Sequence, residues 1–140
     1  MKFTPDRQLA EELGRLLAVS LPPLAIDFIT YIPTDTSRVR QRGFDHAKLI
    51  AQAIAVDRGV PLHDVLGRRR HTRQLGSSRR KRFEQMSDTF VVRAPGAVND
   101  KTVLLIDDVF STGATMLAAT EQLKQAGARR IYGAVLAHNR

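Results

Sequence analysis

Residues 103–115 read Val103-Leu104-Leu105-Ile106-Asp107-Asp108-Val109-Phe110-Ser111-Thr112-Gly113-Ala114-Thr115. The four apolar residues 103–106 are typical of a strand buried on both faces of a sheet. Two carboxylates end this predicted strand, and a short turn leads into a predicted helix over residues 115–126 with Gly127 as its C-cap. The stretch therefore predicts a strand–turn–helix unit of an α/β protein.

The turn after this strand has the features of a phosphate site. Backbone N–H groups of residues 111–115 would point into the turn at a helix N-terminus, where the helix dipole favours an anion. Gly113 lets the backbone approach a phosphate closely, and the neighbouring hydroxyls can donate to its oxygens. Asp107 and Asp108 would repel a phosphate, so they suit ribose hydroxyls or a Mg²⁺ ion held with the sugar. The segment predicts a site for a sugar with a phosphate at one end; the alternative is an ordinary strand, an acidic turn and a capped helix.

The rest of the chain alternates between helical and strand patterns. A helix is predicted from Thr4 to just before Pro22-Pro23, with leucines at helical spacing, and a second over residues 44–58 with Gly59 as its C-cap. Strands are predicted over residues 28–32, 62–66, 90–92 and 131–137, a polar loop over 34–43, and a turn at Gly96. This alternation predicts a mostly parallel sheet flanked by helices, whose ligands bind beyond the carboxyl ends of the strands.

Composition bounds the class of protein. The 140 residues and 43% hydrophobic content fit one globular domain over residues 1–140. No apolar run is long enough to span a bilayer, and the first residues lack the pattern of a signal peptide. The chain has no cysteine, which excludes disulfides and thiolate metal sites, so we expect a cytoplasmic protein.

The positive charge is concentrated in one segment. The formal net charge is +8, and residues 68–82 carry eight Lys or Arg side chains and no acid. Such a block repels itself, so residues 68–87 are predicted to form a flexible basic loop, poorly ordered from about 69 to 85 until an anion arrives. The anion is either a small polyphosphate under a closing lid or a nucleic acid. No aromatic residue interleaves the block, which disfavours a stacking platform for single strands.

Residues 103–115 resemble the motif that binds 5-phosphoribosyl-1-pyrophosphate (PRPP) in type I phosphoribosyltransferases. Two further blocks, Arg38-x-Arg40-x-Arg42-Gly43-Phe44-Asp45-His46-Ala47 and Arg70-x-Thr72-x-Gln74 followed by Arg79 and Lys81-Arg82, are similar to the ComF family of phosphoribosyltransferase-like proteins. Three features depart from that family. The cysteine-bearing zinc module is missing, Asp45-His46 replaces the usual Asn-Gln, and Gln85 stands where an asparagine is expected.

The resemblance implies the type I phosphoribosyltransferase fold and Mg²⁺-dependent transfer of a phosphoribosyl group, with release of pyrophosphate. PRPP or a nucleoside 5′-phosphate is the implied ligand. Asp107 and Asp108 would bind the ribose and Mg²⁺. The 5′-phosphate would be bound by Ser111, Thr112, Gly113, Ala114 and Thr115, the pyrophosphate by Pro33, Thr34, Arg38, Arg40 and Arg42, and the flexible loop would contribute Arg70, Thr72, Gln74, Arg79 and Arg82.

No catalytic residue is identified by the sequence. Purine phosphoribosyltransferases have an aspartate at the position of Ser111, and a serine cannot accept a proton there near neutral pH. Two other functions therefore stay open. One is a PRPP or nucleotide sensor without turnover, and the other is an accessory factor for DNA uptake that binds nucleic acid weakly and without sequence preference. A homodimer also stays open.

Overall fold

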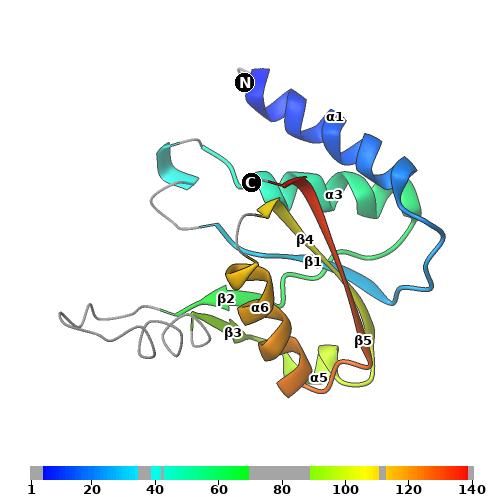
Figure 1. Cartoon of the computed structure of the whole chain (residues 1–140), viewed down its shortest axis with the longest axis vertical. Coiled ribbons are helices and arrows are strands. Elements are labelled where there is room, and N and C mark those ends of the chain that lie inside the picture. Colours follow the sequence, from blue (N-terminus) through cyan, green and yellow to red (C-terminus); the bar gives the residue numbers. More distant parts are fainter. Residues whose placement is uncertain (1–4, 35–38, 42, 70–88, 111–112, 139–140) are drawn as a thin grey trace.

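A parallel sheet forms the centre of the protein. The computed structural model describes residues 5–34, 39–41, 43–69, 89–110 and 113–138. Three strands have the order β1 (Phe28–Tyr31), β4 (Thr102–Phe110) and β5 (Arg130–His138), all parallel. A single-residue parallel bridge between Ile29 and Leu62 extends the sheet beyond β1. Because the strands are parallel, their carboxyl ends meet at one edge of the sheet (Figure 1).

Helices cover both faces of this sheet. Helices α1 (Pro5–Ser20) and α3 (His46–Arg58) lie on one face, and α6 (Ala114–Gln125) lies on the other with the antiparallel hairpin β2 (Leu66–Arg68) and β3 (Phe90–Val92) (Figure 1). Alternate residues of β4 belong to opposite layers: Leu104 and Ile106 join the cluster with α3, whereas Val103 and Leu105 join the cluster with α6. This two-sided burial explains the apolar run and confirms the predicted α/β fold with a parallel sheet flanked by helices.

Helix boundaries follow the predicted signals. Helix α1 ends at Ser20, just before the two prolines. Helix α3 begins after the N-cap Asp45 and ends at Gly59, whose φ of 65° is the left-handed conformation that glycine adopts without strain. The short helix α5 (Pro95–Val98) contains Gly96, so the predicted turn there is wrong: Pro95 occupies the first helical turn, where its missing N–H costs nothing.

Two other predictions need correction. Residues 62–66 form no continuous strand; Leu62 makes the single bridge to Ile29, and the chain then crosses to the hairpin, where β2 begins at Leu66. The predicted polar loop over residues 34–43 contains a helical stretch at residues 39–41. The first deviation follows from tertiary placement, because the chain leaves the main sheet after Leu62 to reach the hairpin, which local sequence patterns do not report.

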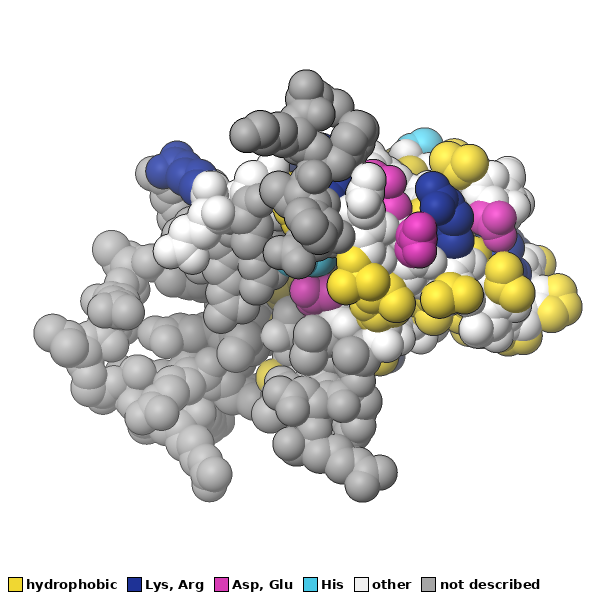
Figure 2. All heavy atoms as spheres, turned by 90° about the horizontal axis from the view of Figure 1, so that it is seen from above, with side chains coloured by type: hydrophobic (Ala, Val, Ile, Leu, Met, Phe, Trp, Pro, Cys, Tyr) yellow, Lys and Arg dark blue, Asp and Glu magenta, His cyan; other side chains and the backbone are white. Residues whose placement is uncertain are grey.

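The leucines of α1 identify the helix but mark its buried face only in part: Leu17 packs against the core, whereas two others are exposed. Leu9 and Leu16 are 56% and 63% exposed, whereas Ala10 and Ala18 are buried against the rest of the protein. At Gly14, an added Cβ would lie only 2.9 Å from the Cβ of Ala53, so α1 and α3 approach each other through small residues. Figure 2, which looks down on this side of the molecule, shows hydrophobic side chains in a row across the surface.

The basic loop was predicted over residues 68–87, but Arg68 belongs to β2, so the loop begins later than predicted. Residues 70–88 lie outside the described residues, so the predicted disorder stays a prediction. The segment joins the two strands of the hairpin, and the N–H of Arg69 donates to the carbonyl of Thr89 at 2.7 Å just beyond the ladder. None of the helices in the described part of the chain is long and apolar enough to cross a membrane.

Candidate functional site

The carboxyl ends of β1 and β4 bring two predicted binding segments together. Tyr31 pairs with Ile106, and the N–H of Ile32 donates to the carbonyl of Ile106 at 2.9 Å. The chain therefore enters Pro33-Thr34 beside Asp107 and Asp108, at the edge where parallel α/β sheets bind ligands. Strand β4 continues past the two carboxylates to Phe110, so the expectation that the strand ends at them is wrong, because β5 still pairs with β4 there.

Asp107 and Asp108 form an interacting pair. Burial, a side-chain hydrogen bond with Asp108 and the charge of that neighbour together raise the pKa of Asp107 to about 7, with burial as the largest cause. The backbone N–H of Asp108 donates to Oδ1 of Asp107 at 2.9 Å. This hydrogen bond lowers the pKa of Asp107, and so does the positive charge of Arg68. A half-buried carboxylate that gives up its proton near neutral pH is ready to accept a cation or a hydroxyl donor, since either one offsets its desolvation.

Arg68 links the two strand ends. Its Nε donates to the carbonyl of Pro33 at 2.6 Å, and its guanidinium lies 5.1 Å from the ring centroid of Phe90. Its positive charge also lowers the pKa of Asp107, as the smallest of the influences on that carboxyl. In the sequence, Arg68 is only the first member of the predicted basic loop. Its place at the end of β2 and its contact with Pro33 depend on the fold, so no local signal distinguishes it.

Helix α6 begins at the predicted phosphate turn. Gly113 is its N-cap with φ 82° and ψ −4°, and its carbonyl accepts from the N–H of Leu117 at 2.8 Å. Ala114 and Thr115 are the first helical residues, so their N–H groups belong to the helix end that favours anions. Ser111 and Thr112 lie outside the described residues.

The predicted pyrophosphate segment is described only in part. Thr34 is tied to Asp45: its N–H donates to Oδ2 at 3.0 Å and its hydroxyl to Oδ1 at 2.8 Å. Arg40 is exposed in the helical stretch at residues 39–41. The other predicted ligands of the pyrophosphate and the flexible loop lie outside the described part of the chain, namely Arg38, Arg42, Arg70, Thr72, Gln74, Arg79 and Arg82.

The donor set at this edge fits a magnesium ion. Within the described residues, no cluster of three or more His, Cys, Asp or Glu side chains is placed to hold a metal. Magnesium needs no such cluster, because it commonly binds through one or two carboxylates together with water and substrate phosphates. Asp107 and Asp108 supply the two carboxylates.

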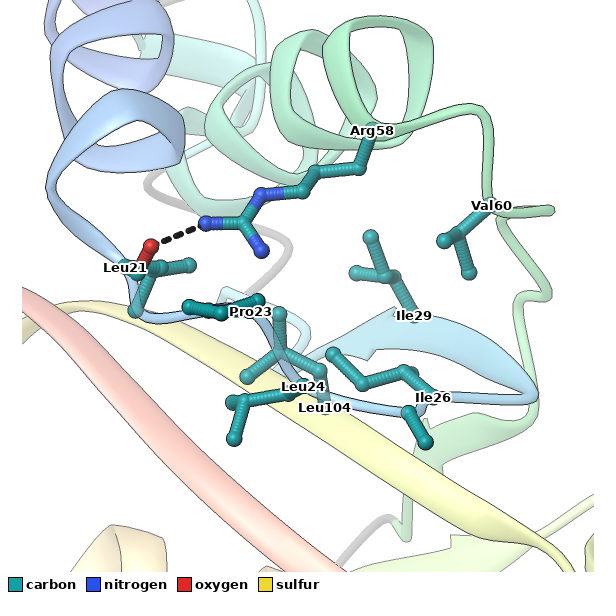
Figure 3. Close-up of a pocket in the computed structure, with 9 residues that line it drawn as sticks. Leu21, Pro23, Leu24, Ile26, Ile29, Arg58, Val60 and Leu104 are labelled. Carbon is teal, nitrogen blue, oxygen red and sulfur yellow. Dashed lines mark hydrogen bonds between the residues drawn. The ribbon is translucent and has the colours of Figure 1, made fainter.

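A cavity of about 360 Å³ lies at the other end of the sheet. It is lined by the segment before β1, by the end of α3 and by Leu104 (Figure 3). Arg58 lines it too, but its guanidinium donates to the backbone carbonyls of Ala18, Leu21 and Pro22 at the end of α1. The hydrogen bonds of Arg58 therefore hold the two helices together, and the cavity is apolar and remote from the paired acids.

The raised pKa of Asp107 predicts a pH-dependent effect on stability. The pKa of the Asp107 carboxyl is higher in the folded than in the unfolded protein, so the folded protein holds this proton more tightly. Its contribution to the free energy of unfolding is therefore fully present below pH 3.8 and is lost as the pH rises to about 7. We expect Asp107→Asn to raise the free energy of unfolding by about 1 kcal/mol at pH 8, less than three full pKa units would give because solvent screens a half-buried group. At pH 4 the gain should be small. Urea unfolding of the wild-type protein and of Asp107→Asn at both pH values measures the difference in the free energy of unfolding. An equal gain at pH 4 and pH 8 would contradict a raised pKa of Asp107.

Comparisons with known proteins point to one family. Residues 39–140 match the family described as the phosphoribosyl transferase domain. The chain is 28% identical over 132 residues to the competence protein ComFC of Streptococcus pneumoniae, which covers 93% of this chain and 56% of that protein. The chain thus spans little more than half the length of this curated relative.

Solved structures share the fold. A glutamine phosphoribosylpyrophosphate amidotransferase from B. subtilis matches with a TM-score of 0.69 and 21% identity, over 93% of this chain and 26% of that chain. A purine phosphoribosyltransferase from Pyrococcus horikoshii matches with a TM-score of 0.59 and 21% identity, over 97% and 75%. The resemblance identified in the sequence is confirmed at the level of the domain family and its fold.

Proposed function

Because the chain belongs to the phosphoribosyl transferase domain family, we propose that it binds PRPP and transfers its phosphoribosyl group with release of pyrophosphate. One observation carries the proposal. A half-buried, interacting carboxylate pair and a glycine-capped helix N-terminus lie on one strand–turn–helix unit, next to the end of β1. This arrangement offers acceptors for sugar hydroxyls and donors for a phosphate, a few residues apart.

Each end of PRPP has a proposed set of partners. Asp107 and Asp108 bind the ribose hydroxyls, and residues 111–115 bind the 5′-phosphate at the start of α6. Pro33 and Thr34, together with Arg38, Arg40 and Arg42, bind the pyrophosphate. Arg68 adds a cation beside Pro33 and Asp107, in support of this assignment. Beyond Arg68, which lies at the end of β2, the rest of the basic loop over residues 69–87 closes over the ligand and excludes water.

The proposed cofactor is Mg²⁺, held by Asp107 and Asp108. When bound, it would offset the negative charge of the pyrophosphate leaving group. The raised pKa of Asp107, about 7, means that its carboxylate must lose a proton to hold the ion, so Mg²⁺ binding should strengthen as the pH rises through neutrality.

The proposed reaction is a substitution at the anomeric carbon. The lone pair of a nucleophile forms a bond to that carbon, the bond from the carbon to the pyrophosphate oxygen breaks, and the electron pair leaves with pyrophosphate. The chain's residues orient the ribose and hold both phosphate groups, which supplies proximity and charge stabilisation. We assign no general base and no acceptor. We also propose that residues 1–140 act as one domain.

Two other functions remain as alternatives. Ser111 cannot accept a proton near neutral pH, which favours a sensor that binds PRPP or a nucleotide without turnover. The basic segment and the likeness to a competence protein favour an accessory role in DNA uptake. In that case nucleic-acid binding should be independent of sequence and fall steeply with added salt.

A pyrophosphate-release assay tests turnover. The protein is mixed with PRPP, Mg²⁺ and each of a panel of nucleobases at pH 8, where Asp107 is ionised. Release that depends on one acceptor supports the transferase, whereas PRPP binding without release from any acceptor supports the sensor. Neither PRPP binding nor release, with salt-sensitive binding of DNA, supports the nucleic-acid role.

A further inference from the structure

Thr34 presents two hydrogen-bond donors to a single anion. Its backbone N–H and its hydroxyl both donate to the carboxylate of Asp45, at 3.0 and 2.8 Å. Two donors that converge from one residue at a strand end form the kind of cradle that accepts the oxygens of a phosphate. In this protein, a carboxylate from eleven residues further along the chain fills the cradle.

Asp45 also stands at a second position that favours an anion. It is the N-cap of the 13-residue helix α3, with extended backbone angles, and its Oδ1 accepts from the N–H of Lys48 at 3.4 Å. This last contact is long for a hydrogen bond, so the two contacts from Thr34 hold the carboxylate more firmly than the helix does. The charge of Asp45 thus lies between the end of β1 and the positive end of α3.

The cradle belongs to the edge where the ligand is proposed to bind. Thr34 follows Pro33, whose carbonyl accepts from Arg68, and Arg68 in turn acts on Asp107. A pyrophosphate placed at this edge would reach the donors of Thr34 while the carboxylate of Asp45 still occupies them. The two anions compete for the same N–H and hydroxyl, and they also repel each other.

We propose that Asp45 competes with pyrophosphate for the donors of Thr34 and thereby weakens the hold of the site on pyrophosphate. This inference rests on the proposed function, because it assumes that pyrophosphate or the pyrophosphate group of PRPP binds beside Thr34. Its consequence is specific: the carboxylate limits product retention, and its removal makes pyrophosphate bind more tightly. The opposite role, a brace that holds Thr34 in its binding position, predicts weaker binding when the carboxylate is removed.

Titration with inorganic pyrophosphate, without and with Mg²⁺, separates the two roles. Asp45→Asn keeps the shape and one acceptor but loses the charge, and its amide nitrogen cannot accept from the Thr34 hydroxyl. We expect pyrophosphate to bind Asp45→Asn about tenfold more tightly than the wild-type protein, which is the difference expected when a charged hydrogen-bond partner becomes neutral. The gain should shrink with added salt, because part of it is relief of charge repulsion.

Two further variants complete the design. Asp45→Ser keeps a good N-cap for α3 but is too short to reach both donors of Thr34, so it should also tighten binding and serves if the asparagine variant folds poorly. Asp27→Asn is the matched control: its carboxylate also accepts a backbone N–H, from Thr102 at 2.8 Å, but at the amino end of the sheet. It removes the same charge and should leave pyrophosphate affinity unchanged.

The outcomes are distinguishable from failure of the proposed function. Equal or weaker pyrophosphate binding in both Asp45 variants, or no binding by any variant, would overturn the competition, even if wild-type protein binds PRPP. Tighter pyrophosphate binding in the Asp45 variants but not in the control supports it. If none of these proteins binds PRPP but the Asp45 variants still bind pyrophosphate more tightly than the wild-type protein does, the competition stands and the proposed function fails.

Discussion

Replacement of Gly113 by valine is expected to abolish PRPP binding, with a loss of at least about a hundredfold in affinity. Gly113 has φ 82° and caps α6, so its backbone lies in a region that a β-branched residue adopts only at a cost of roughly 1–2 kcal/mol. The valine side chain would also occupy the space through which a phosphate approaches the backbone. Calorimetric titration with PRPP measures the loss.

A matched substitution at a second glycine distinguishes the effect of backbone strain on stability from the loss of the phosphate site. Gly59 also has a positive φ, 65°, at the end of a helix, and an added Cβ there would meet no atom within 4 Å. Gly59→Val should therefore lower the melting temperature about as much as Gly113→Val but leave PRPP affinity intact. If both variants lose PRPP binding equally, or if Gly113→Val binds normally, the phosphate site is not at the start of α6.

Substitution of either paired acid by asparagine is expected to weaken PRPP binding by roughly ten- to a hundredfold. A hydrogen bond to a charged group contributes about 1.5–3 kcal/mol, and each 1.4 kcal/mol is a factor of ten in affinity. The titrations belong at pH 8, where Asp107 with its pKa of about 7 is ionised in the wild-type protein. At that pH, Asp107→Asn and Asp108→Asn each remove a full charge.

Inorganic phosphate is the matched ligand for this comparison. It would contact only the turn before α6, so its affinity for both variants should stay the same or rise slightly, since a nearby repulsive charge is gone. A plain acidic turn before a capped helix predicts no difference between the two ligands. Equal changes for PRPP and phosphate in folded variants would remove the ribose-binding role from both acids.

Local patterns in the sequence were sufficient for the central unit of the fold. The apolar run at residues 103–106 predicted a doubly buried strand because a strand between two packed layers has no solvated face. Gly59 is the C-cap of α3 as predicted, whereas the C-cap of α6 is Ala126, one residue before the predicted Gly127; both glycines have positive φ values. The motif also predicted Asp107, Asp108 and Gly113 as ligand contacts; the structure places them on one strand–turn–helix unit, and their binding roles stay predictions.

Features that depend on distant residues could not be predicted in this way. The buried face of α1 is its small-residue face because α3 lies close at Gly14, and no pattern within α1 reports that partner. Arg68 reaches Pro33 across 35 residues, and Asp45 reaches Thr34 across eleven, so neither contact has a local signature. The hairpin of β2 and β3 pairs segments on either side of the long basic segment, a separation at which sequence patterns give no register.

Titration of the wild-type protein with PRPP at pH 8, with and without Mg²⁺, tests the central claim most directly. We expect saturable binding of one PRPP per chain, tightened by Mg²⁺ and weakened as the pH falls below about 7, where Asp107 takes up its proton. A nucleoside 5′-phosphate should compete for the same site. No heat of PRPP binding at any Mg²⁺ concentration, from protein that unfolds cooperatively, would contradict the account.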